Sequence, residues 1–97
     1  MKVFNQPLEF QWDKGNIGKN LKHKAKDKET EESFFDRKRK IYKDVFHSKK
    51  EKRYILIGKT KNKRLLYTVF TMRGKKTRII SSRDINRKEV KMYEKKA

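Results

Sequence analysis

The spacing of apolar residues along the first third of the chain predicts two short helices. Trp12 and Ile17 stand on either side of Asp13 at the positions of a hydrophobic staple, and Leu21 continues the apolar stripe one turn later. Asp13 is a residue type that caps helices, so this spacing predicts a helix over residues 13–23.

The second predicted helix follows directly. Asp27 is its expected N-terminal cap, because an aspartate carboxylate accepts hydrogen bonds from the first free backbone amides of a helix. Three glutamates lie near the positive end of this helix, where the helix dipole favours negative charge. Two phenylalanines then supply its apolar anchor. These five residues are Glu29, Glu31, Glu32, Phe34 and Phe35.

The pattern changes to extended runs after residue 40. Residues 41–46 are rich in β-branched and aromatic side chains, and residues 54–58 form an apolar run that ends at Gly58 and suits a strand covered on both faces. Two further strands are predicted over residues 65–70 and 77–82. Because the turns between the last three strands are short, these strands are expected to form an antiparallel meander.

A last helix is predicted from the capping-box spacing of Asn86 and Glu89, with Ile85 and Val90 as its staple. Two helices, then strands, then a helix are typical of an α+β fold. We therefore expect N-terminal helices packed on one face of an antiparallel sheet, with a C-terminal helix, in a single domain of residues 1–97.

Composition excludes several classes of protein. The chain has no cysteine and two histidines, which excludes a disulfide scaffold and argues against a zinc site, so no metal or cofactor is expected. No apolar run approaches the roughly 20 residues that span a bilayer, and the N-terminus lacks the apolar region of a signal peptide. We expect a soluble, cytoplasmic protein without a membrane partner.

The net charge of +18 is distributed unevenly. Residues 1–36 hold 7 basic and 7 acidic residues, whereas residues 37–97 hold 23 basic and 5 acidic residues and therefore carry the whole excess. All eight arginines lie at or after Arg37. Such a field favours a polyanion, and a planar guanidinium is the better phosphate ligand. The alternative is a lysine-rich surface that only maintains solubility.

Five motifs in register resemble the BrnT family of toxins, from about residue 9 to residue 95. They are Trp12-Asp13, Asn20-x-Lys22-His23, Phe34-Phe35-Asp36, the run from His47-Ser48 through Glu51-x-Arg53-Tyr54 to Gly58, and Ile79-Ile80-Ser81-Ser82-Arg83. The chain departs from the family pattern at Lys24, where members often have glycine, and at Ser82, where they have alanine or methionine.

The resemblance implies a RelE-like fold and a metal-independent endoribonuclease, the toxin of a type II toxin–antitoxin pair. It also implies an RNA substrate and a BrnA-like antitoxin, a DNA-binding ribbon-helix-helix protein encoded beside the toxin. RNA supplies its own nucleophile, the 2′-hydroxyl, so cleavage needs a base, a cation for the phosphorane charge and an acid for the leaving 5′-oxygen. The expected product end is a 2′,3′-cyclic phosphate.

Four residues are the candidates for catalysis. His23 has an imidazole that titrates near neutrality, and the neighbouring Lys22 could supply a cation or a proton. Arg53 and Arg83 are the candidate phosphate ligands. The structural alternative for Arg83 is an ion pair with Glu89 or Asp84, and the alternative for Arg53 is a pair with Glu51.

Five further residues are expected to contact RNA: Arg64, Arg78, His47, Glu51 and Tyr93. The first two flank the meander, and a tyrosine ring can stack on a base. Glu51 could also be a general base, but in a strongly basic protein we expect its pKa to be lowered, which weakens it as a base.

Two other functions are compatible with the charge. One is a basic RNA- or DNA-binding module without catalytic activity, and the other is a structural subunit that an acidic partner recruits. Cleavage of RNA by the isolated chain would separate the first hypothesis from both of these.

Overall fold

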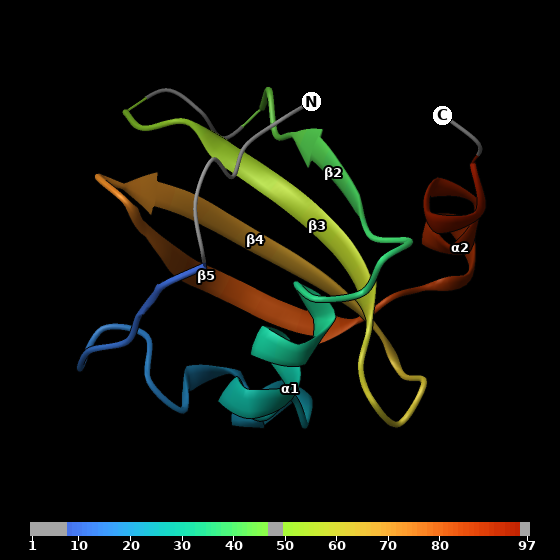
Figure 1. The fold of residues 1–97 in the computed structure, drawn as a ribbon, viewed down its shortest axis with the longest axis horizontal. Helices are drawn as coiled ribbons and strands as arrows, with labels where there is room; N and C mark the ends of the chain where they lie inside the picture. Colours follow the sequence, from blue (N-terminus) through green and yellow to red (C-terminus); the bar gives the residue numbers. More distant parts are fainter. Residues whose placement is uncertain (1–7, 47–49, 96–97) are drawn as a thin grey trace.

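One five-stranded sheet organises the protein, with strand order β1-β5-β4-β3-β2. The computed structural model describes residues 8–46 and 50–95 (Figure 1). In chain order the elements are β1 (Phe10–Gln11), the 3-10 helix η1 (Lys19–His23), α1 (Asp27–Ser33), β2 (Lys40–Lys43), β3 (Arg53–Lys59), β4 (Leu65–Arg73), β5 (Lys76–Asp84) and α2 (Arg87–Glu94).

The predicted strands are present, although the first ends at Lys43 instead of residue 46, and β2 to β5 form a continuous antiparallel meander. The sheet as a whole is mixed, however, because β1 pairs with β5 in parallel. The expectation of a purely antiparallel sheet was therefore wrong. Residues 10–12 were expected to be extended, but a two-residue edge strand carries too little pattern to indicate its partner or its direction.

The first predicted helix was wrong as well. Residues 14–18 form a turn, and only the five residues of η1 are helical, as a 3-10 helix. Gly18 has a φ of 65°, a left-handed conformation that interrupts an α-helix. Ile17 and Leu21 are 61% and 57% exposed, so the predicted staple does not anchor this segment.

Two buried asparagines hold the segment in place instead. The Asn16 side-chain amide donates to the Gln11 carbonyl at 2.9 Å and to the Ile79 carbonyl at 3.0 Å. The Asn20 side-chain oxygen accepts a hydrogen bond from the Ser82 amide at 2.9 Å. These bonds satisfy the edge of β5 where β1 no longer pairs with it, so polar contacts rather than an apolar stripe position this loop.

The second predicted helix is present as α1, although its cap is one residue earlier than expected. Lys26 is the N-cap, and the Asp27 carboxylate accepts from the Gly18 amide at 2.9 Å. Phe34, just after α1, is fully buried among Leu56, Phe70 and other residues of the core. Gly58 allows this approach, because a Cβ there would collide with the Ser33 carbonyl.

The C-terminal helix α2 begins as predicted, with a reciprocal capping box between Asn86 and Glu89. It does not share the sheet face that α1 covers. Ile41 packs on the core beneath α1, and the next residue, Tyr42, points to the other face and donates to the Met92 carbonyl of α2 at 2.6 Å. Figure 1 shows α2 set apart from α1. We call the sheet face opposite α1 the open face.

A candidate phosphate pocket on the open face of the sheet

Three arginines converge on a hollow of about 170 Å³. Its lining comprises Gly15, Asn16, Lys19, Glu51, Arg53, Arg73, Arg78, Ile79 and Ile80. We call this hollow the arginine pocket. It brings together side chains from four separate segments: the loop before η1 and η1 itself, the start of β3, the end of β4 and the start of β5.

Strand register explains why the arginines meet. Arg53 of β3 lies opposite Thr71 of β4, and Thr71 lies opposite Arg78 of β5. Directly paired residues share a face, so Arg53 and Arg78 both project from the open face, with Cα atoms about 10 Å apart across two strand spacings. Arg73 follows Thr71 by two residues and therefore also projects from this face.

Carboxylates only partly balance the charge of the arginine pocket. An Asp13 oxygen accepts from the Arg78 guanidinium at 2.6 Å, and Glu51 lies 3.7 Å from Arg73. The hydrogen bond from Arg78, with a second one from the Gly15 amide, lowers the pKa of Asp13 below its ordinary value. Among the described residues, four cations line the pocket against the single carboxylate of Glu51, so the pocket retains positive charge.

Arg83 lies at the other end of the open face and is held by its neighbours. Its two terminal nitrogens donate to the two oxygens of Glu89, each at 2.8 Å, and its guanidinium lies 4.2 Å from the centre of the Tyr67 ring. This hydrogen bonding lowers the pKa of Glu89 and raises that of Arg83. The structural alternative for Arg83, an ion pair with Glu89, is thus confirmed.

Arg64 joins three parts of the fold. Its Nε donates to Asp84 at 2.5 Å, and one terminal nitrogen donates to the Lys24 carbonyl at 2.6 Å and to Glu29 at 3.3 Å. The other terminal nitrogen donates to the His23 carbonyl at 3.4 Å. Arg64 was expected to contact phosphates, but these bonds tie the β3–β4 turn to α1 and to the end of η1.

The four residues predicted to be catalytic do not meet in one pocket. Among them only Arg53 lines the arginine pocket. Lys22 and His23 are exposed at the end of η1, next to Arg64. Arg83 shares the open face with Arg53, but four residues along β4 and two strand spacings separate their Cα atoms by about 16 Å.

The remaining predicted RNA contacts have varied surroundings. Arg78 and Glu51 both line the arginine pocket.

The Tyr93 hydroxyl donates to Asp36 at 2.6 Å, and burial together with this bond raises the pKa of Tyr93 to about 12. Lys40 and Lys59 lie 5.9 and 5.8 Å from the centre of its ring. His47 lies outside the described residues.

Sequence reasoning missed two of the charged residues that line the arginine pocket, Arg73 and Lys19. A signal for Arg73 was present, because it continues the alternation of β4 immediately before the turn at Gly74. No such signal existed for Lys19, which reaches the pocket only because residues 13–23 form a turn and η1 instead of the predicted α-helix.

Residues 8–46 and 50–95 contain no group of three or more histidine, aspartate or glutamate side chains placed to hold a metal ion. In the same part of the chain, no helix is both long and apolar enough to cross a bilayer.

Comparison with known proteins identifies the family of this chain. No curated protein matches the chain. A family model, described as the ribonuclease toxin BrnT of a type II toxin–antitoxin system, matches residues 12–89. The match covers most of the chain, including strands β2 to β5. It also includes all residues that line the arginine pocket and the pair of Arg83 with Glu89. The chain belongs to the BrnT family of ribonuclease toxins.

Proposed function

We propose that this toxin is a metal-independent endoribonuclease that binds RNA along the open face and cleaves it in the arginine pocket. The observation that carries this proposal is the convergence of Arg53, Arg73 and Arg78 beside Glu51. A phosphodiester seated there meets several guanidinium groups and one carboxylate. Such a site can bind a phosphate and also move a proton.

The arginines stabilise the negative charge that develops on phosphorus. When the RNA 2′-oxygen attacks, its bond to phosphorus forms, and the bond from phosphorus to the 5′-oxygen breaks. Arg53 and Arg78 lie on opposite sides of Thr71, so they can contact a phosphate from two directions. Preorganised cations of this kind act most strongly on charge that appears only in the transition state.

Proton transfer requires a base and an acid. We assign the base to Glu51, because it is the carboxylate that lines the pocket and can reach a 2′-hydroxyl next to a bound phosphate. Glu51 accepts the 2′-hydroxyl proton, and Lys19, which also lines the pocket, donates one to the departing 5′-oxygen. The product is then a 2′,3′-cyclic phosphate and a free 5′-hydroxyl.

Lys22, His23 and Arg83 remain proposed contributors outside the arginine pocket. Arg83 would have to leave Glu89 before it could bind a phosphate with both terminal nitrogens. We therefore propose that Arg83 positions α2, and that Lys22 and His23 contact RNA beyond the cleaved bond.

We further propose that the antitoxin is BrnA-like and DNA-binding, that it covers the arginine pocket, and that the toxin acts on RNA in the cytoplasm. A toxin of this class requires a neutralising partner, and positive charge exposed at the site favours an acidic one.

Cleavage of a defined RNA by the purified chain in EDTA tests this proposal. The expected products carry 2′,3′-cyclic phosphate ends, and a substrate with one 2′-deoxy nucleotide is expected to resist cleavage at that position only. Loss of activity in EDTA would contradict the metal-independent mechanism. Salt-dependent binding without any cleavage would favour the alternative function, a basic nucleic-acid-binding module.

A further inference from the structure

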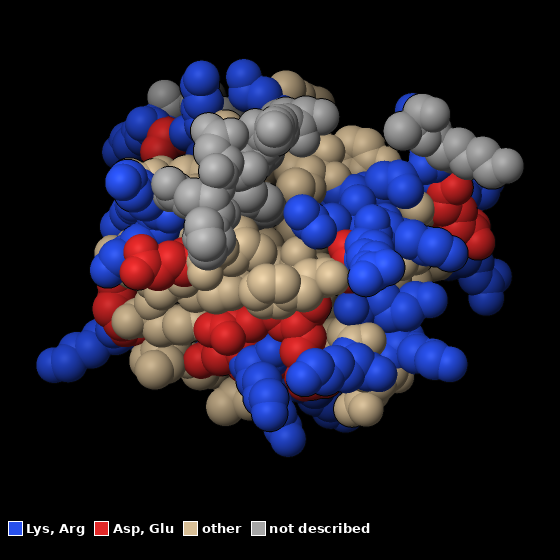
Figure 2. Space-filling model, in the orientation of Figure 1, with Lys and Arg blue, Asp and Glu red and all other residues tan. Residues whose placement is uncertain are grey.

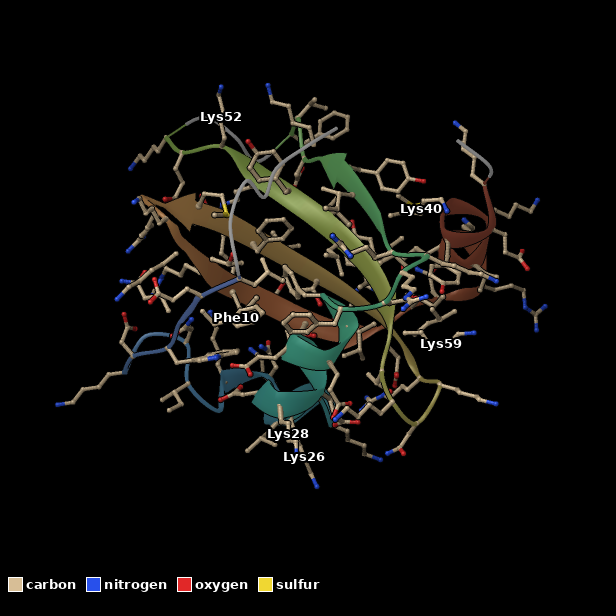
Figure 3. The ribbon with its side chains drawn as sticks, in the orientation of Figure 1. Phe10, Lys26, Lys28, Lys40, Lys52 and Lys59 are labelled. Atoms are coloured by element: carbon tan, nitrogen blue, oxygen red, sulfur yellow. The ribbon has the colours of Figure 1, made fainter. Side chains whose placement is uncertain are left out.

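A groove of about 550 Å³ lies beside α1, at the end of β3 opposite the one where Arg53 lines the arginine pocket. Lys28, Glu32 and Phe35 form one wall, and Lys59 and Lys61 at the β3–β4 turn form the other. We call it the α1 groove. Lys28 on α1 and Lys59 at the end of β3 border this surface on two sides in Figure 3. A groove of this size can accept a large side chain from another molecule.

The carboxylates of the α1 groove are already used by the protein itself. Glu31 accepts from the Trp12 indole at 2.7 Å, and Glu32 accepts from the Lys61 amide at 3.2 Å. Asp36 accepts from the Tyr93 hydroxyl at 2.6 Å and from the Lys59 amide at 2.8 Å. Their hydrogen-bonding capacity is thus directed largely toward this chain.

Phe35 contributes an apolar surface at the same place. Its side chain is 63% exposed, whereas the adjacent Phe34 is fully buried in the core. The Phe35 ring packs at its inner side against Phe10, with ring centres 6.5 Å apart. An exposed aromatic ring supported by a second ring is typical of the anchor positions of protein interfaces.

The lysines around the groove remain available to a partner. Lys28 and Lys61 are exposed, and within the described part of the chain neither ammonium group has a hydrogen bond or an ion pair. Figure 2 shows the acidic side chains of this face next to uncharged surface, with lysines and arginines around them. Three lysines and three acids line the groove, so it offers no net charge for a run of RNA phosphates. Lys28 and Lys61, whose ammonium groups are unpaired among the described residues, can still each pair with one carboxylate of a protein segment.

We infer that the α1 groove binds an acidic segment of the antitoxin, which inserts one large apolar side chain against Phe35 and pairs with Lys28 and Lys61. The protein measures 30 × 28 × 27 Å, and an extended segment of about 10 residues spans about 33 Å. One antitoxin chain can therefore occupy the groove and still cover the arginine pocket. The inference rests on the proposed function only for the identity of this partner.

The test uses the protein encoded beside this toxin, purified and titrated calorimetrically against the full chain. Phe35→Glu places a carboxylate against the incoming apolar side chain, and we expect it to weaken binding about 30-fold or more. Lys28→Glu combined with Lys61→Glu changes only exposed side chains and is expected to weaken binding about tenfold. Lys88→Glu, an exposed change on α2, is the matched control. RNA cleavage by each isolated variant and its thermal unfolding are measured alongside.

Weaker antitoxin binding with unchanged RNA cleavage would support the inference. Wild-type affinity in both groove variants would overturn it, and so would a loss of RNA cleavage in the double lysine variant, which would place RNA in the groove. A wild-type dimer that Phe35→Glu dissociates would overturn it too, because a second copy would then occupy the groove. Each of these results leaves the proposed cleavage mechanism open to its own test in the isolated chain.

Discussion

The two ends of the open face both present arginines, yet they differ in how their charge is compensated. Arg83 has its two terminal nitrogens on one carboxylate and its planar group against Tyr67. At the other end, four cations line one hollow with Glu51, and a second carboxylate, Asp13, accepts from Arg78 at 2.6 Å. The four are Lys19, Arg53, Arg73 and Arg78, so the positive charges exceed these two carboxylates by two. The first arrangement resembles a structural pair, whereas the second leaves positive charge available to a ligand.

This difference shows that arginine content alone does not identify a phosphate site. The sequence made Arg53 and Arg83 equivalent candidates, because each lies near the end of a strand with an acidic residue nearby. The contacts that each arginine makes in the folded protein distinguish the two candidates. A guanidinium that donates two hydrogen bonds to a carboxylate must break both to bind RNA, and those bonds are charge-assisted.

Substitution of one carboxylate at each end should give the largest difference in activity between the two ends. Glu51→Gln is expected to reduce RNA cleavage about 100-fold or more, because it removes the proposed base while keeping the size of the side chain. Glu89→Gln is the matched control and is expected to change cleavage less than fivefold. Equal losses in both variants, measured under single-turnover conditions, would show that the two ends are not functionally distinct.

Arg64 gives the largest expected effect on stability. Its side chain is 23% exposed and bonds to Asp84, Glu29 and two backbone carbonyls, so Arg64→Ala leaves several acceptors without their donor. We expect the free energy of unfolding to fall by about 2 to 3 kcal/mol, as measured by urea denaturation. Arg37→Ala removes the same charge from an exposed loop and is expected to change stability by less than about 0.5 kcal/mol.

The pair of Arg83 and Glu89 should contribute less. The Arg83 side chain is 39% exposed, so solvent screens the pair, and a double-mutant cycle with Arg83→Ala and Glu89→Ala is expected to give a coupling of about 1 kcal/mol. A coupling near zero would remove the proposed role of this pair in positioning α2.

The lowered pKa of Glu89 predicts an acid-side signature of the same pair. Because the folded pKa lies below the unfolded value near 4.5, the pair stabilises the protein above that value, and the contribution is lost as the pH falls through the folded pKa. Denaturation of the wild type and of Glu89→Gln between pH 6 and pH 3 should therefore converge toward the acid end. Parallel curves would contradict the lowered pKa.

Tyr93 gives the smallest expected effect, at alkaline pH. Its pKa of about 12 in the folded protein exceeds the ordinary value of 10.0, so its contribution is present below pH 10 and is lost as the pH rises toward 12. Tyr93→Phe should lose about 1 kcal/mol at neutral pH and show a shallower decline above pH 10. If the stability of Tyr93→Phe fell above pH 10 as steeply as that of the wild type, the decline would come from other groups, such as the lysines.

Much of the sheet could be predicted because its strands carry strong local patterns. The apolar run before Gly58 and the capping box of Asn86 and Glu89 each specify an element without help from distant residues. The segment before α1 could not be predicted in this way. Asn16 and Asn20 hold it to β5 through backbone groups that are more than 60 residues away in sequence.

The candidate site was predictable only in its chemistry. Sequence indicated arginines for phosphate and named Arg53, Arg78 and Glu51, which do meet. Their meeting depends on strand register across β3, β4 and β5, including an irregularity in the pairing next to Phe70. Such a register shift changes which side chains share a face of the sheet, and no local pattern in the sequence predicts it. The RelE-like fold that the family resemblance implies remains a prediction.

The most direct test of the arginine pocket as the cleavage site compares Arg53→Ala with Arg83→Ala in one assay. Both variants lose one arginine from the open face, so the nonspecific attraction to RNA falls equally. Single-turnover cleavage in EDTA, with RNA binding measured separately, is expected to slow about 100-fold or more for Arg53→Ala and less than tenfold for Arg83→Ala. The reverse order would contradict the account and place the cleaved bond at the Arg83 end of the sheet.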